Sequence, residues 1–384
     1  MLFLRSKARV PFILLFLLLI LAIPSLAGNL PPIQTVFVIL MENHDWSEIQ
    51  GSPSAPYINN TLLPMASYCT QYYNPPNLHP SEPNYLWLEA GTNFGVTNDA
   101  DPACNHQSST NHLVTLLKNA GISWKSYVED IPGGTLPLTS FGAYVAEHVP
   151  FLYFDDVTGT NNPNDPYGVA HVRPYTEFAG DAMTNHVASY NFFTPDICSD
   201  MHNDCTGDAI KQGDDWLAIL VPGILGSQAW QNNGAIFILW DESIDGDHAI
   251  GMIVISKLAK GGGYSNAIHY THSSTLRTIQ EIFCVTPLLG DAANANDLGD
   301  LFLPAGGTNA ACNSRITGFA FQPNGAFQVS FNAMMGVSYT LQASADLAHW
   351  TSVTNITAEA TIPFQLADPA ASTFPARYYR LSSP

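Results

Sequence analysis

The sequence predicts an α/β fold, a mixed and mostly parallel sheet flanked by helices, followed by a small all-β module at the C-terminus. Apolar, β-branched runs alternate with helical patterns as far as about residue 290. These runs are apolar throughout, as in strands that are covered on both faces. After roughly Cys312 the period changes to two, turn residues come at short intervals and the helical pattern ends, which indicates a β-sandwich.

The individual elements follow from the same patterns. A helix is predicted at "SSTNHLVTLLKNAG" (108–121), which has Ser and Thr at its start and Gly121 just past its end. A second helix, "HSSTLRTIQEIF" (272–283), combines capping residues with helical apolar spacing. The linker to the β module is predicted at 290–315, which is rich in Gly, Ala, Asn and Asp. The predicted strands are "TVFVIL" (35–40), "ISWKSYVED" (122–130), "AIFILW" (235–240) and "GMIVIS" (251–256).

The N-terminus is typical of a secretory signal peptide. Three basic residues precede a long apolar run that closes in small residues, with a cleavage point after Ala27. An uncleaved anchor is the alternative, although the run is short for a bilayer span of about 20 residues. We therefore expect a signal peptide at 1–27, a catalytic domain at 28–312 and a β module at 313–384. We also expect a secreted or periplasmic protein with no integral membrane domain after signal removal.

Charge narrows the range of partners. The 384 residues include 13 Lys and Arg against 32 Asp and Glu, a formal net charge of −19. Nucleic acids and anionic membranes bind cationic surfaces, so nucleic-acid binding is not expected. If the substrate is itself an anion, a local cation must offset this field, and a bound metal ion is the natural candidate.

Six cysteines fit an oxidising compartment, and a local bridge between Cys198 and Cys205 in "CSDMHNDC" is the pairing we favour. Six cysteines allow fifteen pairings, so the others stay open. A zinc site built from cysteines is disfavoured because the sequence contains no CxxC pair.

Two predicted strands end in acidic or amide side chains. "TVFVIL" runs into Glu42 and Asn43, and "AIFILW" runs into Asp241 and Glu242. Ligands of open α/β sheets gather at the carboxyl ends of the strands, so these groups converge if both strands are parallel and central. Oxygen ligands of this kind suit a hard or borderline divalent cation. Two solvated strand ends are the alternative.

A third candidate is Ser81 in "HPSEPNYLWLEAG". Pro83 follows closely, and Pro is favoured in the first turn of a helix, which would make Ser81 the N-cap. The same position would also stabilise a phosphate carried on the hydroxyl, because backbone N–H groups point toward it.

Seven collinear motifs resemble a known family. In order they are "VFVILMENH", "HPSEPNYLWLEAG", "SYVEDIPG", "EHVPFLYF", "DMHNDC…GDDWL", "FILWDE" and "HSSTLRTIQEIF", over roughly residues 33–290. They resemble the secreted phosphoesterases, bacterial and fungal acid phosphatases and phosphatidylcholine-cleaving phospholipases C, of the alkaline-phosphatase-like superfamily.

The resemblance implies a metal centre and a nucleophile. Glu42 and Asn43 match the first metal-ligand pair, and Asp241 and Glu242 match the later acidic pair, although some relatives have two aspartates there. Ser81 matches the nucleophile, which also touches the metal. One divalent ion is expected, and the oxygen-only set favours Mg, Ca or Mn. Zinc stays open, because superfamily relatives bind it with carboxylates and histidines.

The resemblance also implies roles for two histidines. His148 in "EHVPF" and His202 in "DMHND" match histidines that line the phosphate pocket, and either would protonate the leaving oxygen. His79 and His272 are weaker candidates.

The expected function is hydrolysis of a phosphoester, as an acid-phosphatase-like phosphomonoesterase that forms a phosphoserine. A phospholipase C acting on phosphatidylcholine-type lipids is one alternative, and a catalytically inactive surface-binding protein is another. The expected partner is therefore a small phosphoester or a phospholipid. In the β module we expect Trp350, Tyr378 and Tyr379 to lie in the core, with contact to a surface glycan as the alternative role.

Overall fold

The computed structural model describes residues 30–304, 316–323, 325–333, 338–357, 362–374 and 376–382. The predicted signal peptide lies outside these ranges and stays a prediction. In the described parts of the chain, no helix is both long enough and apolar enough to cross a membrane.

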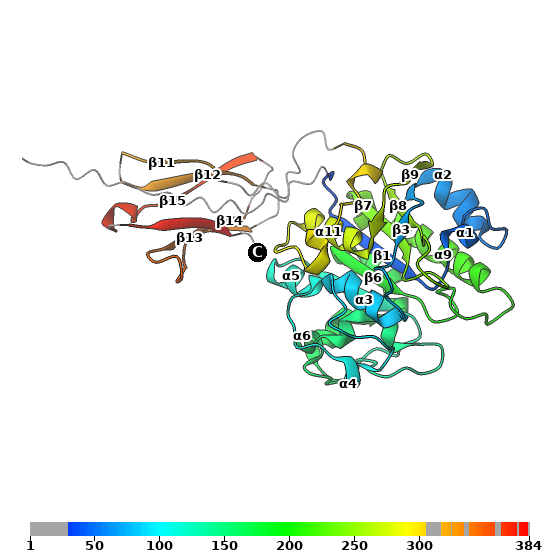
Figure 1. The fold of residues 1–384 in the computed structure, drawn as a ribbon. Coiled ribbons are helices and arrows are strands. Elements are labelled where there is room, and N and C mark those ends of the chain that lie inside the picture. Colours follow the sequence, from blue (N-terminus) through cyan, green and yellow to red (C-terminus); the bar gives the residue numbers. More distant parts are fainter. Residues whose placement is uncertain are drawn as a thin grey trace, which may run out of the picture.

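An eight-stranded mixed sheet lies at the centre of the α/β domain (Figure 1). The strand order is β5-β4-β6-β1-β7-β8-β2-β9, and the run from β5 to β7 is parallel throughout. β8 is antiparallel to both of its neighbours. The bounds are β1 Thr35–Met41, β2 Ser67–Cys69, β4 Trp124–Val128, β5 Val172–Pro174, β6 Tyr190–Thr194, β7 Gly234–Trp240, β8 Met252–Ser256 and β9 Tyr264–Asn266.

Helices cover both faces of this sheet (Figure 1). Every residue of β1 and of β7 is buried, as expected for central strands between two helical layers. α3, α5 and α11 pack against one another, and α9 packs against α8 and α10. The bounds are α1 Trp46–Ile49, α2 Leu63–Met65, α3 Ser81–Ala90, α4 Pro102–Asn105, α5 Leu113–Asn119, α6 Asp155–Thr158, α7 Pro166–His171, α8 Phe178–Thr184, α9 Ala209–Gly226, α10 Gln228–Gln231 and α11 His272–Phe283. β3 (Tyr72–Tyr73) and β10 (Tyr270–Thr271) form a separate pair.

The C-terminal strands form two three-stranded antiparallel sheets, β11-β12-β15 and β14-β13-β16. The predicted fold class, α/β followed by an all-β module, is therefore confirmed. The prediction that Tyr378 is a core residue is wrong, because its side chain is 38% exposed, and Trp350 and Tyr379 are only partly buried. The bounds are β11 Ile316–Phe321, β12 Phe327–Ala333, β13 Ser338–Ser344, β14 Thr351–Thr357, β15 Ile362–Asp368 and β16 Tyr378–Ser382.

The predicted bridge between Cys198 and Cys205 is present. Cys284 is also disulfide-bonded. Cys69, which is buried, and Cys104, which is exposed, are free thiols, so not every cysteine is bridged.

Candidate active site

The carboxyl ends of β1 and β7 bring two buried carboxylates together. The two strands pair in register up to Met41 and Trp240, so Glu42 and Asp241 follow at the same level. The backbone N–H of Asp241 donates to the carbonyl of Met41 at 2.9 Å, which continues the strand pairing by one residue. Both acidic residues have no exposed surface. The predicted convergence of the two strand ends is therefore what the fold produces.

Asn43 sits between these two carboxylates. Its backbone N–H donates to Asp241 Oδ1 at 3.0 Å. One terminal atom of its amide lies 3.0 and 3.2 Å from the Asp241 carboxylate oxygens and 3.1 Å from Glu42 Oε2. With nitrogen at that position the amide donates to both carboxylates. With oxygen there, three oxygen-bearing groups face one another, which is favourable only around a cation.

Ser81 faces the same carboxylates from the start of α3. Its hydroxyl donates to Glu42 Oε2 at 3.0 Å, and it is 4% exposed. The hydroxyl of Tyr85, one turn further along α3, donates to Glu42 Oε1. The helix begins one residue earlier than expected, because Pro80 is the N-cap and Ser81 is the first helical residue. The Ser81 side chain is thereby left to contact the carboxylates instead of capping the helix.

His148 contacts a carboxylate, that of Asp200, which was not predicted from the sequence. Asp200 Oδ2 lies 3.1 Å from His148 Nδ1, and His148 Nε2 lies 3.5 Å from Glu42 Oε1. The imidazole is also stacked on the ring of Tyr85, with 5.1 Å between the ring centroids. Burial lowers the pKa of His148, but hydrogen bonding to Asp200 and the charge of that carboxylate outweigh it and raise the pKa above its usual value.

The structure thus brings together a second group that could hold a cation. Glu42, His148 and Asp200 each offer one ligand atom, and these atoms lie within 4.8 Å of one another. Asp200 has no exposed surface, and its backbone carbonyl accepts a hydrogen bond from the backbone N–H of Glu42 at 2.8 Å. Glu42 belongs to both this set and the predicted oxygen set.

Glu242 lies beside the cluster and has different partners. Its Oε2 atom accepts a hydrogen bond from Asn84 Nδ2 at 2.8 Å and lies 3.0 Å from His79 Nδ1. Burial, reinforced by the charge of Asp241, raises the pKa of Glu242 to about 9. These contacts tie the strand end to the segment around α3.

The two remaining histidines differ sharply in exposure. His202 is exposed, and its ring centroid lies 6.3 Å from that of His148. His272 is fully buried, and its Nε2–H donates to the backbone carbonyl of Asp241 at 2.5 Å. Burial lowers the pKa of His272 to about 4, so it is neutral at most pH values. His202 is open to a ligand, whereas His272 positions Asp241.

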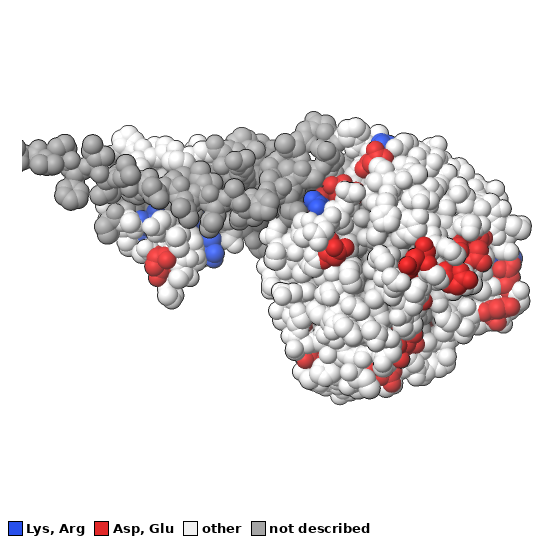
Figure 2. Space-filling view, viewed as in Figure 1, with Lys and Arg blue, Asp and Glu red and all other residues white. Residues whose placement is uncertain are grey.

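The charges of the cluster fit a bound divalent cation. Burial and the neighbouring carboxylates raise the pKa of Glu42, and burial raises the pKa values of Asp200 and Asp241. In the described part of the chain, no Lys or Arg forms an ion pair with any of these three groups. On the face drawn in Figure 2, Asp and Glu also outnumber Lys and Arg over the α/β domain. Buried carboxylates without cationic partners are costly unless a proton or a metal ion compensates them.

The first turn of α3 has fewer free backbone N–H groups for binding an anion than we expected from the sequence. The backbone N–H of Glu82 already donates to Asp99 Oδ1 at 2.9 Å, and Pro83 has no N–H to offer. An anion at Ser81 must therefore be balanced mainly by a cation and by the histidines.

Comparison with known proteins agrees with this geometry. The sequence profile of the Phosphoesterase family matches residues 66–251, which include Ser81 and Asp241. The chain is 29% identical over 278 residues to a phosphatidylinositol-3-phosphatase of Mycobacterium tuberculosis, covering 72% of this chain and 85% of that protein. The chain is a phosphoesterase. It is also 29% identical over 192 residues to a probable acid phosphatase of Kluyveromyces lactis, covering 48% of this chain and 42% of that one.

Among solved structures, a protein of the alkaline phosphatase superfamily from Vibrio parahaemolyticus matches with a TM-score of 0.48 and 12% identity. That match covers 85% of this phosphoesterase and 84% of the other chain. Hydrolysis of phosphoric esters, as predicted from the seven motifs, is confirmed by the family and its relatives.

Proposed function

We propose that this phosphoesterase is an exported, metal-dependent phosphomonoesterase whose nucleophile is Ser81. The observation that carries the proposal is the hydrogen bond from Ser81 Oγ to Glu42 Oε2, 3.0 Å long, inside a buried cluster of carboxylates. A serine at a helix start needs no such partner for structural reasons. A hydroxyl held against buried carboxylates that form no ion pair with a Lys or Arg in the described part of the chain is suited to becoming an alkoxide beside a cation.

Glu42, Asn43, Ser81 and Asp241 would hold the cation, and the side chains of Asp200 and His148 lie beside the same cluster. When bound, a divalent cation lowers the pKa of the serine hydroxyl and offsets negative charge on the phosphoryl oxygens. Ser81 Oγ forms a bond to phosphorus as the bond between phosphorus and the leaving alcohol breaks, and the serine proton leaves along its hydrogen bond to Glu42. Water then attacks the phosphorus, the bond between phosphorus and Ser81 Oγ breaks, the serine oxygen regains its proton from Glu42, and inorganic phosphate is released.

The two histidines handle the leaving group in this proposal. The Asp200 carboxylate fixes the imidazole of His148 by its Nδ1 atom, which leaves Nε2 facing the cluster. His202 lies on the exposed side, where an alcohol would depart. A protonated imidazole at either position would give the departing oxygen its proton.

Trapping the phosphoenzyme tests this proposal. The mature protein is incubated with 4-nitrophenyl phosphate, quenched in acid and digested, and mass spectrometry should find phosphate on the peptide that contains Ser81. Ser81→Ala should abolish both the modification and turnover. Ser227→Ala is the matched control, because it also removes a serine at a helix start, one that caps α10, and it should keep full turnover. Phosphate on another residue would reject Ser81 as nucleophile.

A lipid monoester is the second candidate substrate, because the relative from Mycobacterium tuberculosis is named a phosphatidylinositol-3-phosphatase. Turnover rates should be compared for three substrates. Fastest hydrolysis of a soluble monoester indicates a phosphomonoesterase, of a phosphoinositide a lipid phosphatase, and of phosphatidylcholine a phospholipase C. Absence of turnover with every ester, across added Mg, Ca, Mn and Zn, would favour the surface-binding alternative. Export rests on the N-terminal run and agrees with the bridge between Cys198 and Cys205.

A further inference from the structure

A cavity of about 560 Å³ opens at the carboxyl ends of β4 and β5. Glu129 and Asp130 follow β4 directly, and Tyr175 follows β5. Phe141 closes the cavity from the loop that leads to His148, and its side chain is 46% exposed. The cavity therefore combines two carboxylates with two aromatic rings.

This cavity lies at the same edge of the sheet as Ser81 and its carboxylates. β4 is separated from β1 only by β6, so the two strand ends lie roughly 10 Å apart. The Asp196 backbone N–H donates to Glu129 Oε2 at 3.1 Å, and the Asp200 N–H donates to the Asp196 carbonyl at 2.9 Å. The segment that carries Asp200 thus contacts the cavity wall at Glu129, and Phe141 comes from the loop that leads to His148.

The charges of the cavity exclude an anion. Its lining contains Glu129 and Asp130 and no Lys, Arg or His, and in the described part of the chain neither carboxylate forms an ion pair. The nearby Arg173 is engaged elsewhere, because its guanidinium donates to both carboxylate oxygens of Glu177. Aromatic faces beside carboxylates are the surroundings in which proteins bind alkylammonium groups.

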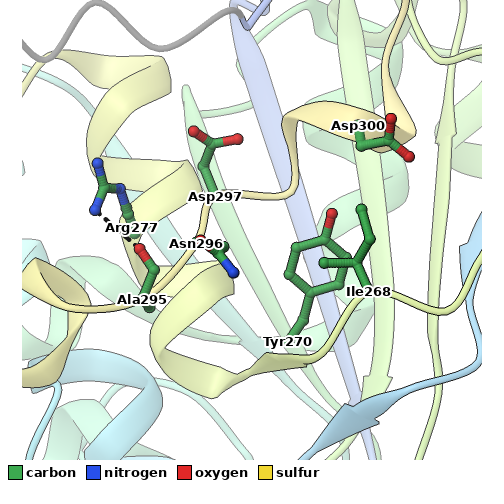
Figure 3. Close-up of a pocket in the computed structure, with 7 residues that line it drawn as sticks. All are labelled: Ile268, Tyr270, Arg277, Ala295, Asn296, Asp297 and Asp300. Carbon is green, nitrogen blue, oxygen red and sulfur yellow. Dashed lines mark hydrogen bonds between the residues drawn. The ribbon is translucent and has the colours of Figure 1, made fainter.

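A second depression is lined by charged residues that interact with other groups of the protein (Figure 3). There Arg277 donates to the carbonyl of Ala295 at 2.8 Å and to Glu281 at 2.8 Å. Asp300 accepts hydrogen bonds from Lys260, Tyr264 and Asn266. Arg277 and Asp300 each form an ion pair within the protein, whereas in the described part of the chain the Glu129 and Asp130 carboxylates form none.

We propose that the cavity formed by Glu129, Asp130, Phe141 and Tyr175 is a specificity site that binds a cationic ammonium group on the alcohol part of the substrate, while the phosphate lies at Ser81. This inference rests on the proposed function for the position of the phosphate. The separation between the two sites requires a spacer, so a long amino alcohol phosphate fits and a two-carbon one is too short to reach both.

Paired substrates test the proposal. The specificity constant kcat/KM is compared for 8-aminooctyl phosphate and octyl phosphate, which have equal chains and differ in the terminal ammonium group. The wild type should prefer the amine by about fivefold, through KM. Asp130→Asn and Phe141→Ala should each bring this ratio toward one. Asp215→Asn, which removes an exposed carboxylate on α9, is the control and should keep the ratio. The two-carbon pair, 2-aminoethyl and ethyl phosphate, should show no preference in any of these proteins.

A ratio of one in the wild type, or a preference that survives Asp130→Asn, would overturn the proposal. Failure of the proposed function would look different, because no substrate would turn over. In that case calorimetry with benzyltrimethylammonium still reports on the cavity. Binding to Ser81→Ala that is weakened by adding Asp130→Asn supports the site, and binding that is absent, or unchanged by Asp130→Asn, rejects it.

Discussion

Replacing Glu42 by Gln should have opposite effects on stability with and without the metal ion. In the ion-free protein the Glu42 and Asp241 carboxylates are no more than about 6 Å apart, since one Asn43 atom lies 3.0 Å from Asp241 and 3.1 Å from Glu42. Two charges at that separation repel by about 3 kcal/mol at the dielectric constant usual for protein sites. Glu42→Gln removes this repulsion.

The sign of the pH dependence follows from the raised pKa of Glu42. Burial moves this pKa well above 4.5, so above that pH the folded ion-free protein binds a proton that the unfolded chain has lost. The free energy of unfolding of the wild type therefore falls as pH rises. Glutamine does not titrate, and the advantage of the variant should grow from pH 5 to pH 8. At pH 8 it should reach between about 1 and 3 kcal/mol, a rise in Tm of several degrees.

Binding of the ion should make the wild type the more stable of the two proteins. A ligand at 100 times its dissociation constant stabilises the folded state by about 2.7 kcal/mol, and the variant has lost a central ligand. Thermal unfolding is followed at pH 8 in chelator and in excess Mg or Mn. The variant should be the more stable protein in chelator and the less stable one with the ion.

Glu281→Gln serves as the matched control. Burial raises the pKa of Glu281 to about 7, and this residue lies on α11 outside the carboxylate cluster. The free energy of unfolding of this variant should also increase relative to that of the wild type as pH rises, but by the same amount with and without the ion. If Glu42→Gln shifted stability by the same amount in both conditions, the metal site at Glu42 would be refuted.

Three further predictions concern the surroundings of the site. Tyr85→Phe removes the hydroxyl that donates to Glu42, and kcat should fall roughly ten- to a hundredfold, the value of one hydrogen bond to a charged group. Replacing Cys198 and Cys205 by Ser opens a loop with a sequence separation of 7, and denaturant titration should show a loss of about 2–3 kcal/mol. Residues 1–315 should retain phosphatase activity, because every candidate site residue precedes that point; an inactive but folded truncation would contradict this.

The part of the site that sequence predicted depends on strands that are easy to recognise. "TVFVIL" and "AIFILW" are continuous apolar runs, and their pairing as β1 and β7 placed Glu42 next to Asp241. Asp200 was missed because β6, "YNFFT", is five residues long and contains a polar Asn191. The sequence does indicate β6, because an aromatic run bounded by Ser189 and Pro195 has the composition of a short strand.

Contacts between side chains on different elements could not be predicted in this way. Tyr85 stood in a quoted motif, but its contact with Glu42 depends on how α3 is rotated over the sheet. Glu242 is next to Asp241 in the sequence, yet alternation along the backbone sends it toward Asn84 and His79. The sequence therefore placed His148 and Glu242 at the site, whereas Asp200, which contacts His148, was not predicted.

The arrangement around Ser81 explains why a cation is central to the proposed reaction. Helix starts often balance a phosphate with backbone N–H groups, but here Asp99 accepts the N–H of Glu82 and Pro83 has none. The nearest carboxylates, Glu42 and Asp241, would repel the phosphate, and His148 supplies at most one positive charge. A divalent ion turns the same carboxylates from a source of repulsion into ligands. Ion binding, the stabilisation that the ion provides at pH 8 and turnover should consequently be lost together when Glu42 is replaced.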